Sequence, residues 1–554
     1  MKLNYKKVIF VGFAFFLITA FWQAYDSIVP MMLVNKFGLN QTLSGVIMAL
    51  DNVLALVLLP VFGAISDKTK SKYGKRTPYV VIGTIMAIIA FMGLTFCDNM
   101  QLNNVYSNAN ESQFFEMVWE HGDDIKVSNK EYSEGQEKEY SLKDYVSRLT
   151  KNKPYASLSE SEKQEVKNSF ISLAGDYDKT YTYIDGEYTL VDENAENGKN
   201  IYSNIITPCK SAYAWTVTVN NPLPIILFVA VLLITLLSMA TFRSPAVALM
   251  PDVTIKPLRS KANAIINLMG TAGGILVLVL GMIFGTGKVY NQTMSYTFFV
   301  LAVCAIMAVG LILFLLKVRE VKWAKEMEDE TALLTEQGLI KEEIVEETGE
   351  KLSKSKTISL ILILASVALW FMGYNAITTK YSLYASNVLH KDYNTTLLIA
   401  QAAAIVAYVP VGIIASKIGR KKSILAGVIM LAVAFFSATF VTSQSPEIII
   451  TIFFALAGIG WATINVNSFP MVVELAKGSN TGKYTGLYYT ASMSAQIITP
   501  VLSGAIMDLS GTMTVLFPYA TIFVIGSFIT MLFVKHGDNK VTEKKSVLEH
   551  LDVD

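Results

Sequence analysis

The chain has 554 residues, of which 52% are hydrophobic and only 16% are charged, whereas soluble proteins average about 25% charged residues. This composition indicates a polytopic membrane protein and excludes an ordinary soluble domain. The formal net charge is +1, and no basic stripe with interleaved aromatic residues occurs outside the predicted membrane-edge loops, so we expect no nucleic-acid partner.

Apolar stretches long enough to cross a membrane follow one another from residue 8 to residue 535. We predict twelve spans, at 8–34, 42–66, 79–97, 223–250, 262–285, 295–317, 358–386, 394–415, 424–443, 446–472, 484–507 and 513–535. The first stretch is not a signal peptide by its pattern, since no small-residue cleavage site follows it. An even number of spans puts both termini on one side, and clusters of Lys and Arg in the loops predict that this side is cytoplasmic.

Two predicted loops carry the same pattern of glycine and charge. The second span ends in GAISDKTKSKYGKR and the eighth in GIIASKIGRKK. The shared positions are Gly63, Lys68, Gly74, Lys75 and Arg76 in the first loop and Gly412, Lys417, Gly419, Arg420 and Lys421 in the second, with Ser416 where Asp67 stands. This pattern resembles the loop between helices two and three of major facilitator transporters, and it occurs at two corresponding places.

Other residues repeat at a fixed spacing. The pairs separated by 349 residues are Tyr25-Asp26 with Tyr374-Asn375, and Gly63 with Gly412. The pairs separated by 222 residues, after spans four and ten, are Asp252 with Glu474 and Lys261 with Lys483. The two offsets differ by 349 − 222 = 127 residues. The first half must therefore hold about 127 extra residues between its third and fourth spans. Two parallel six-span repeats that enclose a midplane site are the architecture expected of a secondary transporter.

These boundaries predict an all-α polytopic membrane protein with one inserted unit, and the resemblance of the repeated loop implies the major facilitator fold. The predicted parts are 1–97 and 222–317 (first half), 98–221 (insert), 318–357 (cytoplasmic linker), 358–535 (second half) and 536–554 (cytoplasmic tail). We expect an extracytoplasmic α+β insert, with a helix over Leu158 to Leu173 and a hairpin at Asp185-Gly186. Cys97 and Cys209 flank it, and either they form a disulfide or both thiols are unpaired.

Among the charged residues inside predicted spans, three stand out: Asp26, Asp51 and Arg243. A charge at the centre of a span costs roughly 2.5–3.5 kcal/mol, so each is a functional candidate. Asp51 lies about 15 Å into its span at 1.5 Å per residue, where a carboxylate can bind a proton or a cation. Its alternative role is a hydrogen bond between helices. Arg243 can hold substrate hydroxyls or pair with either acid, and a structural salt bridge is its alternative role.

Aromatic and polar residues surround Asp26, and the seventh span repeats part of this pattern. Aromatic faces suit the CH faces of sugar rings, whereas amides and carboxylates bind the hydroxyls. An interfacial aromatic belt is the alternative interpretation. The predicted substrate-binding residues are Trp22, Gln23, Tyr25, Asp26, Arg243, Tyr374, Asn375 and Asn465.

A narrower resemblance lies in two motifs. RSPAVALMPD in the fourth span resembles the arginine motif that ends the fourth helix of sucrose–proton symporters, and DKTKSKYGKRTPYVVIG resembles the glycoside-pentoside-hexuronide cation symporters. The resemblance covers the spans but not the insert. It implies that Arg243 binds substrate and that Asp51 or Asp26 couples a cation to sugar. The paired carboxylates of sodium-using melibiose permeases are missing before Pro60, which favours a proton over sodium.

Charged residues at the predicted cytoplasmic edge are expected to control the movement of the halves rather than to bind substrate. An aspartate that faces Lys or Arg there can lock one conformation and release the other. Asp252–Lys261 and Glu474–Lys483 are predicted as latches across the cytoplasmic mouth. The predicted gating residues are Gly63, Asp67, Lys68, Gly74, Lys75, Arg76, Asp252, Lys261, Glu474 and Lys483.

Three function classes remain: a cation-coupled sugar importer, an exporter of drugs or metabolites on the same fold, and a membrane sensor that uses the insert. Polar residues within the spans favour a hydrophilic substrate and hence the first class. The four histidines form no metal-ligand or catalytic grouping in the sequence, so we expect neither an enzyme nor a cofactor. The expected partners are a sugar or glycoside, a proton or sodium ion, and the lipid of the cell membrane, and we expect a monomer.

Overall fold

The computed structural model describes residues 3–105, 111–120, 122–123, 126–129, 138–184, 187–190, 207–255, 258–288, 294–337, 353–443, 445–473 and 481–536. A long helix stands at each of the twelve predicted spans. The first half contains α1 (Tyr5–Met31) with its π-helical extension η1 (Met32–Lys36), α2 (Gln41–Lys68), α3 (Thr77–Val105), α9 (Leu223–Val253), α10 (Arg259–Phe284) and α11 (Thr297–Lys317). The second contains α13 (Lys354–Tyr384) with its π-helical extension η7 (Ala385–Leu389), α14 (Tyr393–Ile418), α15 (Arg420–Ala438), α16 (Glu447–Val473), α17 (Thr481–Ser510) and α18 (Leu516–Leu532).

Composition and capping explain why these stretches are helices. Within the described residues, 10 stretches are long and apolar enough to cross a membrane, and of the twelve bundle helices only α14 and α17 are outside that set. A helix satisfies its own backbone hydrogen bonds, which lipid cannot do. Polar residues mark several starts: the Asn40 side chain accepts from Leu43 N at 2.8 Å, and Asn4 accepts from Lys7 N at 3.2 Å.

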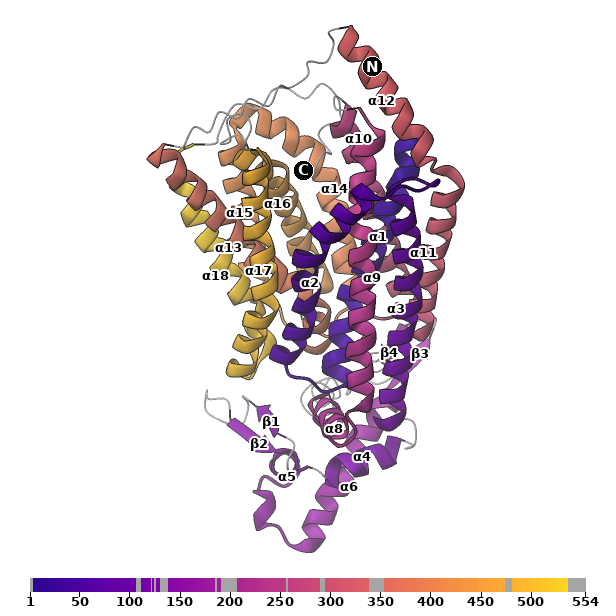
Figure 1. Ribbon diagram of the computed structural model, residues 1–554. Helices are drawn as coiled ribbons and strands as arrows, with labels where there is room; N and C mark the ends of the chain where they lie inside the picture. The colour runs from indigo at the N-terminus through magenta and orange to yellow at the C-terminus, as the bar shows by residue number, and fades with distance from the viewer. Residues whose placement is uncertain are drawn as a thin grey trace.

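The two halves repeat the same packing. In the first half α3 and α2 both pack on α9, while α1 packs on α11. In the second half α15 and α14 both pack on α16, while α13 packs on α18. Across the halves, α2 contacts α17 and α10 contacts α14, which are corresponding pairs. The chain is therefore an all-α bundle of two six-helix repeats, drawn in indigo to magenta and in orange to yellow in Figure 1.

The insert and the linker between the halves lie at opposite ends of the bundle. The elements of the insert are α4 (Glu111–Glu120), β1 (Lys126–Asn129), β2 (Lys138–Ser141), α5 (Leu142–Lys151), η2 (Tyr155–Ser157), α6 (Glu160–Thr180), β3 (Tyr181–Ile184), β4 (Glu187–Leu190) and α8 (Thr207–Asn220). Figure 1 shows α4, α5, α6 and α8 at the lower end and α12 (Glu320–Glu336), in the linker, at the upper end. We name these ends the insert face and the linker face.

The insert has the mixed α and β content that its sequence predicts. Helix α6 covers the stretch with helical spacing, and β3 and β4 form an antiparallel pair with Tyr183 opposite Tyr188. The residues of the turn, 185–186, lie outside the described residues. The Trp119 ring packs 5.3 Å from that of Phe170 and 5.9 Å from that of Tyr155, so α4, α6 and η2 share an aromatic core.

Helix α3 continues to Val105, beyond the predicted end of the third span at residue 97. Its last turns are polar but buried: Lys36 Nζ lies 2.5 Å from Asp98 Oδ2, and both side chains are fully buried. Gln101 Nε2 donates to Lys36 O at 3.1 Å and to Thr218 Oγ1 of α8 at 2.9 Å. A buried pair of this kind is costly to break, so it fixes the base of the insert to the end of α1.

The cysteine beside this pair is a free thiol. Cys97 is buried and forms no disulfide. The side chain of Cys209 lies outside the described residues. The sequence leaves open a Cys97–Cys209 disulfide or two unpaired thiols, and in the structure the Cys97 thiol is unpaired.

Candidate functional site

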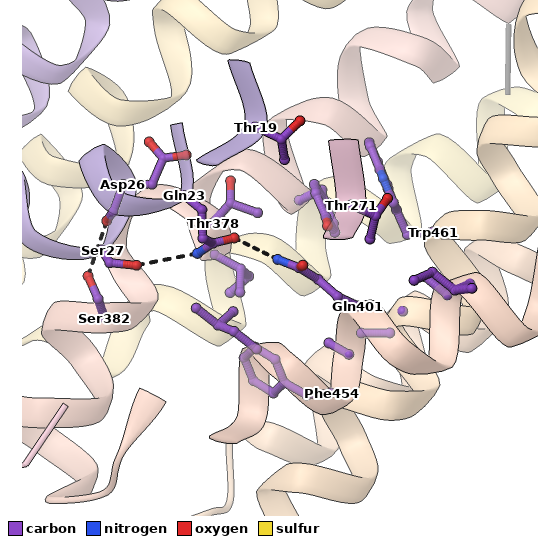
Figure 2. Close-up of a pocket in the computed structure, with 18 of the residues that line it drawn as sticks. Thr19, Gln23, Asp26, Ser27, Thr271, Thr378, Ser382, Gln401, Phe454 and Trp461 are labelled. Carbon is purple, nitrogen blue, oxygen red and sulfur yellow. Dashed lines mark hydrogen bonds between the residues drawn. The ribbon is translucent and has the colours of Figure 1, made fainter. Parts of the chain in front are cut away.

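A cavity of about 300 Å³ lies between the two halves, at the lower end of the range for ligand pockets, about 300–1,000 Å³. Helices α1 and α10 line it from the first half, and α13, α14, α15 and α16 line it from the second (Figure 2). Its polar lining residues are Thr19, Gln23, Asp26, Ser27, Thr271, Thr378, Ser382 and Gln401, and its aromatic ones are Tyr374, Tyr408, Phe435, Phe454 and Trp461.

A chain of hydrogen bonds crosses this cavity. Gln401 Nε2 donates to Gln23 Oε1 at 2.6 Å, and Gln23 Nε2 donates to Ser27 Oγ at 3.3 Å (Figure 2). Gln401 Oε1 is buried and has no hydrogen-bond partner within the described residues. A buried acceptor without a donor is costly, so this oxygen suits a ligand that brings a hydroxyl or amide donor.

One wall of the cavity is aromatic. The rings of Tyr374 and Trp461 are stacked with centroids 3.6 Å apart and planes 5° apart, and Phe371 meets Trp461 edge-on at 5.3 Å. Close helix packing holds the wall in place, because a Cβ added at Gly458 would lie 2.2 Å from Ala400 O. The wall gives the cavity a rigid apolar surface in addition to its glutamines.

The structure brings only part of the predicted substrate site into the cavity. Gln23, Asp26 and Tyr374 line it, whereas Tyr25 is fully buried and packs against Phe21 with ring centroids 5.9 Å apart. Successive helix residues point about 100° apart at 3.6 residues per turn, so neighbours in the sequence face different sides. Trp22, Asn375 and Asn465 also fall outside the lining set. Gln401 and Trp461 belong to it and are absent from the predicted site.

Arg243 and Asp51, two predicted charged residues of the spans, are outside the lining set. The Arg243 guanidinium lies 5.7 Å from the centroid of the Trp22 ring, within the range of a cation–π contact. It interacts electrostatically with Asp51 and Tyr489, and Asp51 interacts with Asp26. Asp51 Oδ1 accepts from N and Nδ2 of Asn52, both at 2.6 Å. Arg243 and Asp51 are thus electrostatic neighbours, although no direct ion pair joins them in the described part of the chain.

At the insert face, a buried lysine joins the two halves. Lys380 Nζ of α13 is fully buried and donates to Gln41 O at 2.9 Å and to Gln41 Oε1 at 3.2 Å. Asp508 of α17 caps α2 from the other half: its carboxylate accepts from Gln41 N at 2.9 Å and from Thr42 N at 2.7 Å. A carboxylate at a helix N-terminus is stabilising, so α2 is held by two helices of the second half.

The helices of this closure touch backbone to backbone. A Cβ added at Gly45 would lie 2.0 Å from Pro500 O, and one added at Gly504 would lie 2.3 Å from Gln41 O. Where α10 meets α14, Tyr393 OH donates to Thr286 Oγ1 at 2.8 Å. These contacts seal the insert face along both α2–α17 and α10–α14.

At the linker face, the contacts centre on Arg76 and stay within the first half and its linker. Arg76 Nε donates to Asp252 Oδ2 at 2.7 Å, and Arg76 NH2 donates to Asp67. Burial lowers the pKa of the Arg76 guanidinium, but the hydrogen bonds and charges of Asp252 and Asp67 outweigh it and raise that pKa above its usual value. The two carboxylates therefore hold the Arg76 guanidinium in place and in its charged form.

Glu320 of α12 caps α3 next to this cation. Its carboxylate accepts from Arg76 N at 2.9 Å and from Thr77 N and Thr77 Oγ1, both at 2.7 Å. Gly74 approaches it closely with a φ of 110°, and an added Cβ would lie 2.2 Å from Glu320 Cδ. Only glycine fits both the backbone angle and the space. The linker helix is therefore docked on the repeated loop.

The predicted latches are only partly described. Asp252 binds Arg76 and Lys75 of its own half, with Lys75 Nζ 3.3 Å from Asp252 Oδ2, rather than closing a mouth between halves. Glu474 and the side chains of Lys261 and Lys483 lie outside the described residues. In the second loop, Lys421 Nζ donates to Leu532 O at 2.9 Å and Val534 O at 2.6 Å. A second cavity, of about 550 Å³, lies between α2, α9 and α17 and includes Gly63 and Asp67 in its lining.

Solved structures share this architecture. The inward-open structure of the xylose transporter XylE from E. coli matches with a TM-score of 0.55 and 12% identity over 98% of both chains. A D-xylose–proton symporter matches with a TM-score of 0.54 and 12% identity over 96% of this chain and 98% of that one. A peptide transporter POT bound to alafosfalin matches with a TM-score of 0.52 and 10% identity over 96% and 93%. At such identities the likeness shows the fold alone, which is the all-α polytopic fold of major facilitator transporters.

The sequence comparisons place the chain within that class. A profile of the MFS_1 like family matches residues 4–515, so the chain belongs to the MFS_1 like family and is a transporter rather than an enzyme. An uncharacterized MFS-type transporter of Methanocaldococcus jannaschii is 29% identical over 126 residues, or 23% of this chain. That match spans only 30% of the relative's length.

Proposed function

We propose that the protein is a proton-coupled symporter of a sugar or glycoside that works by alternating access. The observation that carries this proposal is the cavity between the halves, whose lining combines the Tyr374–Trp461 stack with the hydrogen-bonded pair Gln23 and Gln401. A sugar ring has apolar CH faces and hydroxyls that both donate and accept, and this combination complements both walls. The buried, unpartnered Gln401 Oε1 supports a substrate with hydroxyl donors.

Asp51 is proposed as the coupling carboxylate, with Asp26 as its neighbour. Asp26 lines the cavity, and Asp51 is within electrostatic reach of both Asp26 and Arg243. Protonation of Asp51 removes a charge from the site, whereas the guanidinium favours the charged form. Substrate and proton then act on one conformational equilibrium, which is how two ligands become coupled. Arg243, supported by Trp22, is proposed to contact substrate when the cavity changes shape.

Tyr25, Asn375 and Asn465 keep lesser roles in this proposal. Tyr25 packs against Trp22, with the two ring centroids 5.3 Å apart. Asn375 Nδ2 is buried without a partner in the described chain, and Asn465 is the repeat counterpart of Arg243 at the offset of 222. Each is placed to face substrate if its helix turns during transport.

The proposed setting is the cell membrane, with the linker face and both termini in the cytoplasm. The Lys and Arg residues of the loops at the linker face support this orientation. The insert then stands outside the cell, and the protein acts as a monomer. An exporter of drugs or metabolites and a sensor that uses the insert remain the alternatives. The polar lining of the cavity suits a hydrophilic substrate, which favours the sugar symporter over both alternatives.

Uptake of radiolabelled sugars into vesicles, with and without an imposed pH gradient, tests the proposal. An acidic outer side is expected to drive accumulation of at least one sugar or glycoside in the panel. Asp51→Asn is expected to abolish uphill accumulation while preserving exchange down the sugar gradient, and Arg243→Ala to weaken sugar binding. Accumulation that is independent of the pH gradient would contradict proton coupling, and absence of uptake for the whole panel would favour the alternatives.

A further inference from the structure

A second, apolar groove of about 660 Å³ runs along the outside of the second half. It lies between α14, α15 and α16, and its wall residues on α14 run from Ile399 to Ile418, a length of about 28 Å at 1.5 Å per residue. Val406 in this wall is 75% exposed. The groove shares no lining residue with the substrate cavity, because the two lie on different faces of α14.

Two lysines stand at the linker-face end of the groove. Lys417 follows Ile414 by three residues and Pro410 by seven on α14, and both are wall residues. Residues at such spacings lie on one helix face. Lys422 precedes the wall residues Ala426 and Met430 of α15 by four and eight. Each apolar stripe therefore ends in a lysine.

These lysines differ from the basic residues of the repeated loop in the first half. There, Arg76 is held by Asp67 and Asp252, whereas the second loop has Ser416 in place of the first acid. Lys417 and Lys422 are both exposed and form no ion pair within the described residues. Two unpaired cations beside a long apolar groove complement a molecule with an anionic head and an apolar tail.

We propose that this groove binds an anionic phospholipid, with one acyl chain against α14 and α15 and the phosphate between Lys417 and Lys422. Acyl chains fill apolar surface that would otherwise be left unpacked, and a basic residue near the headgroup layer attracts an anionic lipid. The lipid then packs on the back of the helix that carries Gln401 into the substrate cavity.

Native mass spectrometry of the purified full chain, titrated with phosphatidylglycerol or with phosphatidylcholine of the same acyl chains, tests the site. Phosphatidylglycerol is expected to bind more tightly. Each lysine should contribute about fivefold to this preference. The double variant Lys417→Gln/Lys422→Gln should therefore lose about 25-fold in phosphatidylglycerol affinity and keep its phosphatidylcholine affinity. The matched control is Lys322→Gln on α12, a lysine with 74% side-chain exposure, which should change neither.

A second pair of variants tests the groove itself. Ala426→Trp places a large ring in the groove from an exposed position and should weaken the binding of both lipids more than tenfold. Ile312→Trp adds the same ring on α11 in the first half, at a residue that is 54% exposed and far from the groove in the chain, and should leave binding unchanged. Equal affinity of the wild type for both lipids, an unchanged preference in the double lysine variant, or unchanged binding in Ala426→Trp would each overturn the proposal.

Discussion

The insert face and the linker face of the bundle are held by contacts of different kinds. At the insert face the bonds cross between the halves: Lys380 and Asp508 hold Gln41, and Tyr393 holds Thr286. At the linker face the bonds centred on Arg76 join α2, α3 and α9 of the first half and bring in only the linker helix. The ribbons of α2 and α17 meet at the insert face and diverge toward the linker face (Figure 1).

This difference assigns distinct tasks to the two faces. Cross-half bonds must break when the halves separate, so they set the free energy of opening at the insert face. Bonds within one half do not break for that reason, and they preserve the shape of the half as it moves. Contacts between the halves therefore close the insert face in this conformation, and we expect the cavity to be reached from the linker face.

The largest effect is expected where closure brings two backbones together. Gly45→Ala puts a Cβ 2.0 Å from Pro500 O, and neither backbone can move aside as a side chain would. The variant should fail to close the insert face, and the initial transport rate should fall at least tenfold. Gly486→Ala on α17 is the control, because nothing lies within 4 Å of its added Cβ. Equal transport rates in the two variants would show that this contact is not needed for closure.

A smaller effect is expected at the buried lysine. Lys380→Met removes the charged donor and leaves Gln41 O without it. Hydrogen bonds to charged groups contribute about 1.5–3 kcal/mol, so the closed insert face should become about ten- to 100-fold less favoured. Distances between spin labels across the insert face report this population. Lys391→Met is the control, since Lys391 bonds to Ser443 O within its own half and should not alter the distances. Unchanged distances in Lys380→Met would remove this residue from the closure.

The charge network of the linker face should affect rate rather than affinity. Asp67→Asn weakens the pairing to Arg76, but Asp252 remains bound to the same guanidinium. Because Asp67 is 60% exposed, solvent screens the pair and the transport rate should fall only several-fold. Equilibrium sugar binding should be nearly intact. Loss of sugar binding in a folded Asp67→Asn variant would show that Asp67 acts in the substrate site rather than in the charge network of the linker face.

The smallest effect is expected for the outermost pair of this network. Lys75 lies 3.3 Å from Asp252 with 39% of its side chain exposed, and such pairs contribute about 0–1 kcal/mol. Lys75→Gln should therefore change the transport rate less than fivefold. A larger loss than that of Asp67→Asn, measured in the same vesicles, would reverse the order of importance within the network.

The sequence predicts the bundle well because its signals are periodic and strong. Span lengths, the offsets of 349 and 222 and the repeated loop predict twelve helices in two halves, and the structure has them. The end of α3 was harder to predict, since Asp98 and Gln101 look like loop residues. They stay helical only because Lys36 and Thr218, distant in sequence, bury them.

The cavity could be predicted only in part, because an apolar helix gives little sign of which face meets the other half. Asp26 and Tyr25 are adjacent, yet one lines the cavity and the other is fully buried. The repeat offers a signal for Gln401, which is 349 residues after Asn52, the neighbour of Asp51. Trp461 has no such signal, since its place in the wall depends on the contact between Gly458 and Ala400.

Access to the cavity from each side of the membrane tests the central claim most directly. A cysteine placed in the lining by Thr271→Cys, in a chain whose three native cysteines are replaced by serine, can be alkylated with a membrane-impermeant maleimide in vesicles of either orientation. Without substrate, we expect fast labelling from the linker face and little from the insert face. Labelling that is equally fast or faster from the insert face would contradict the account.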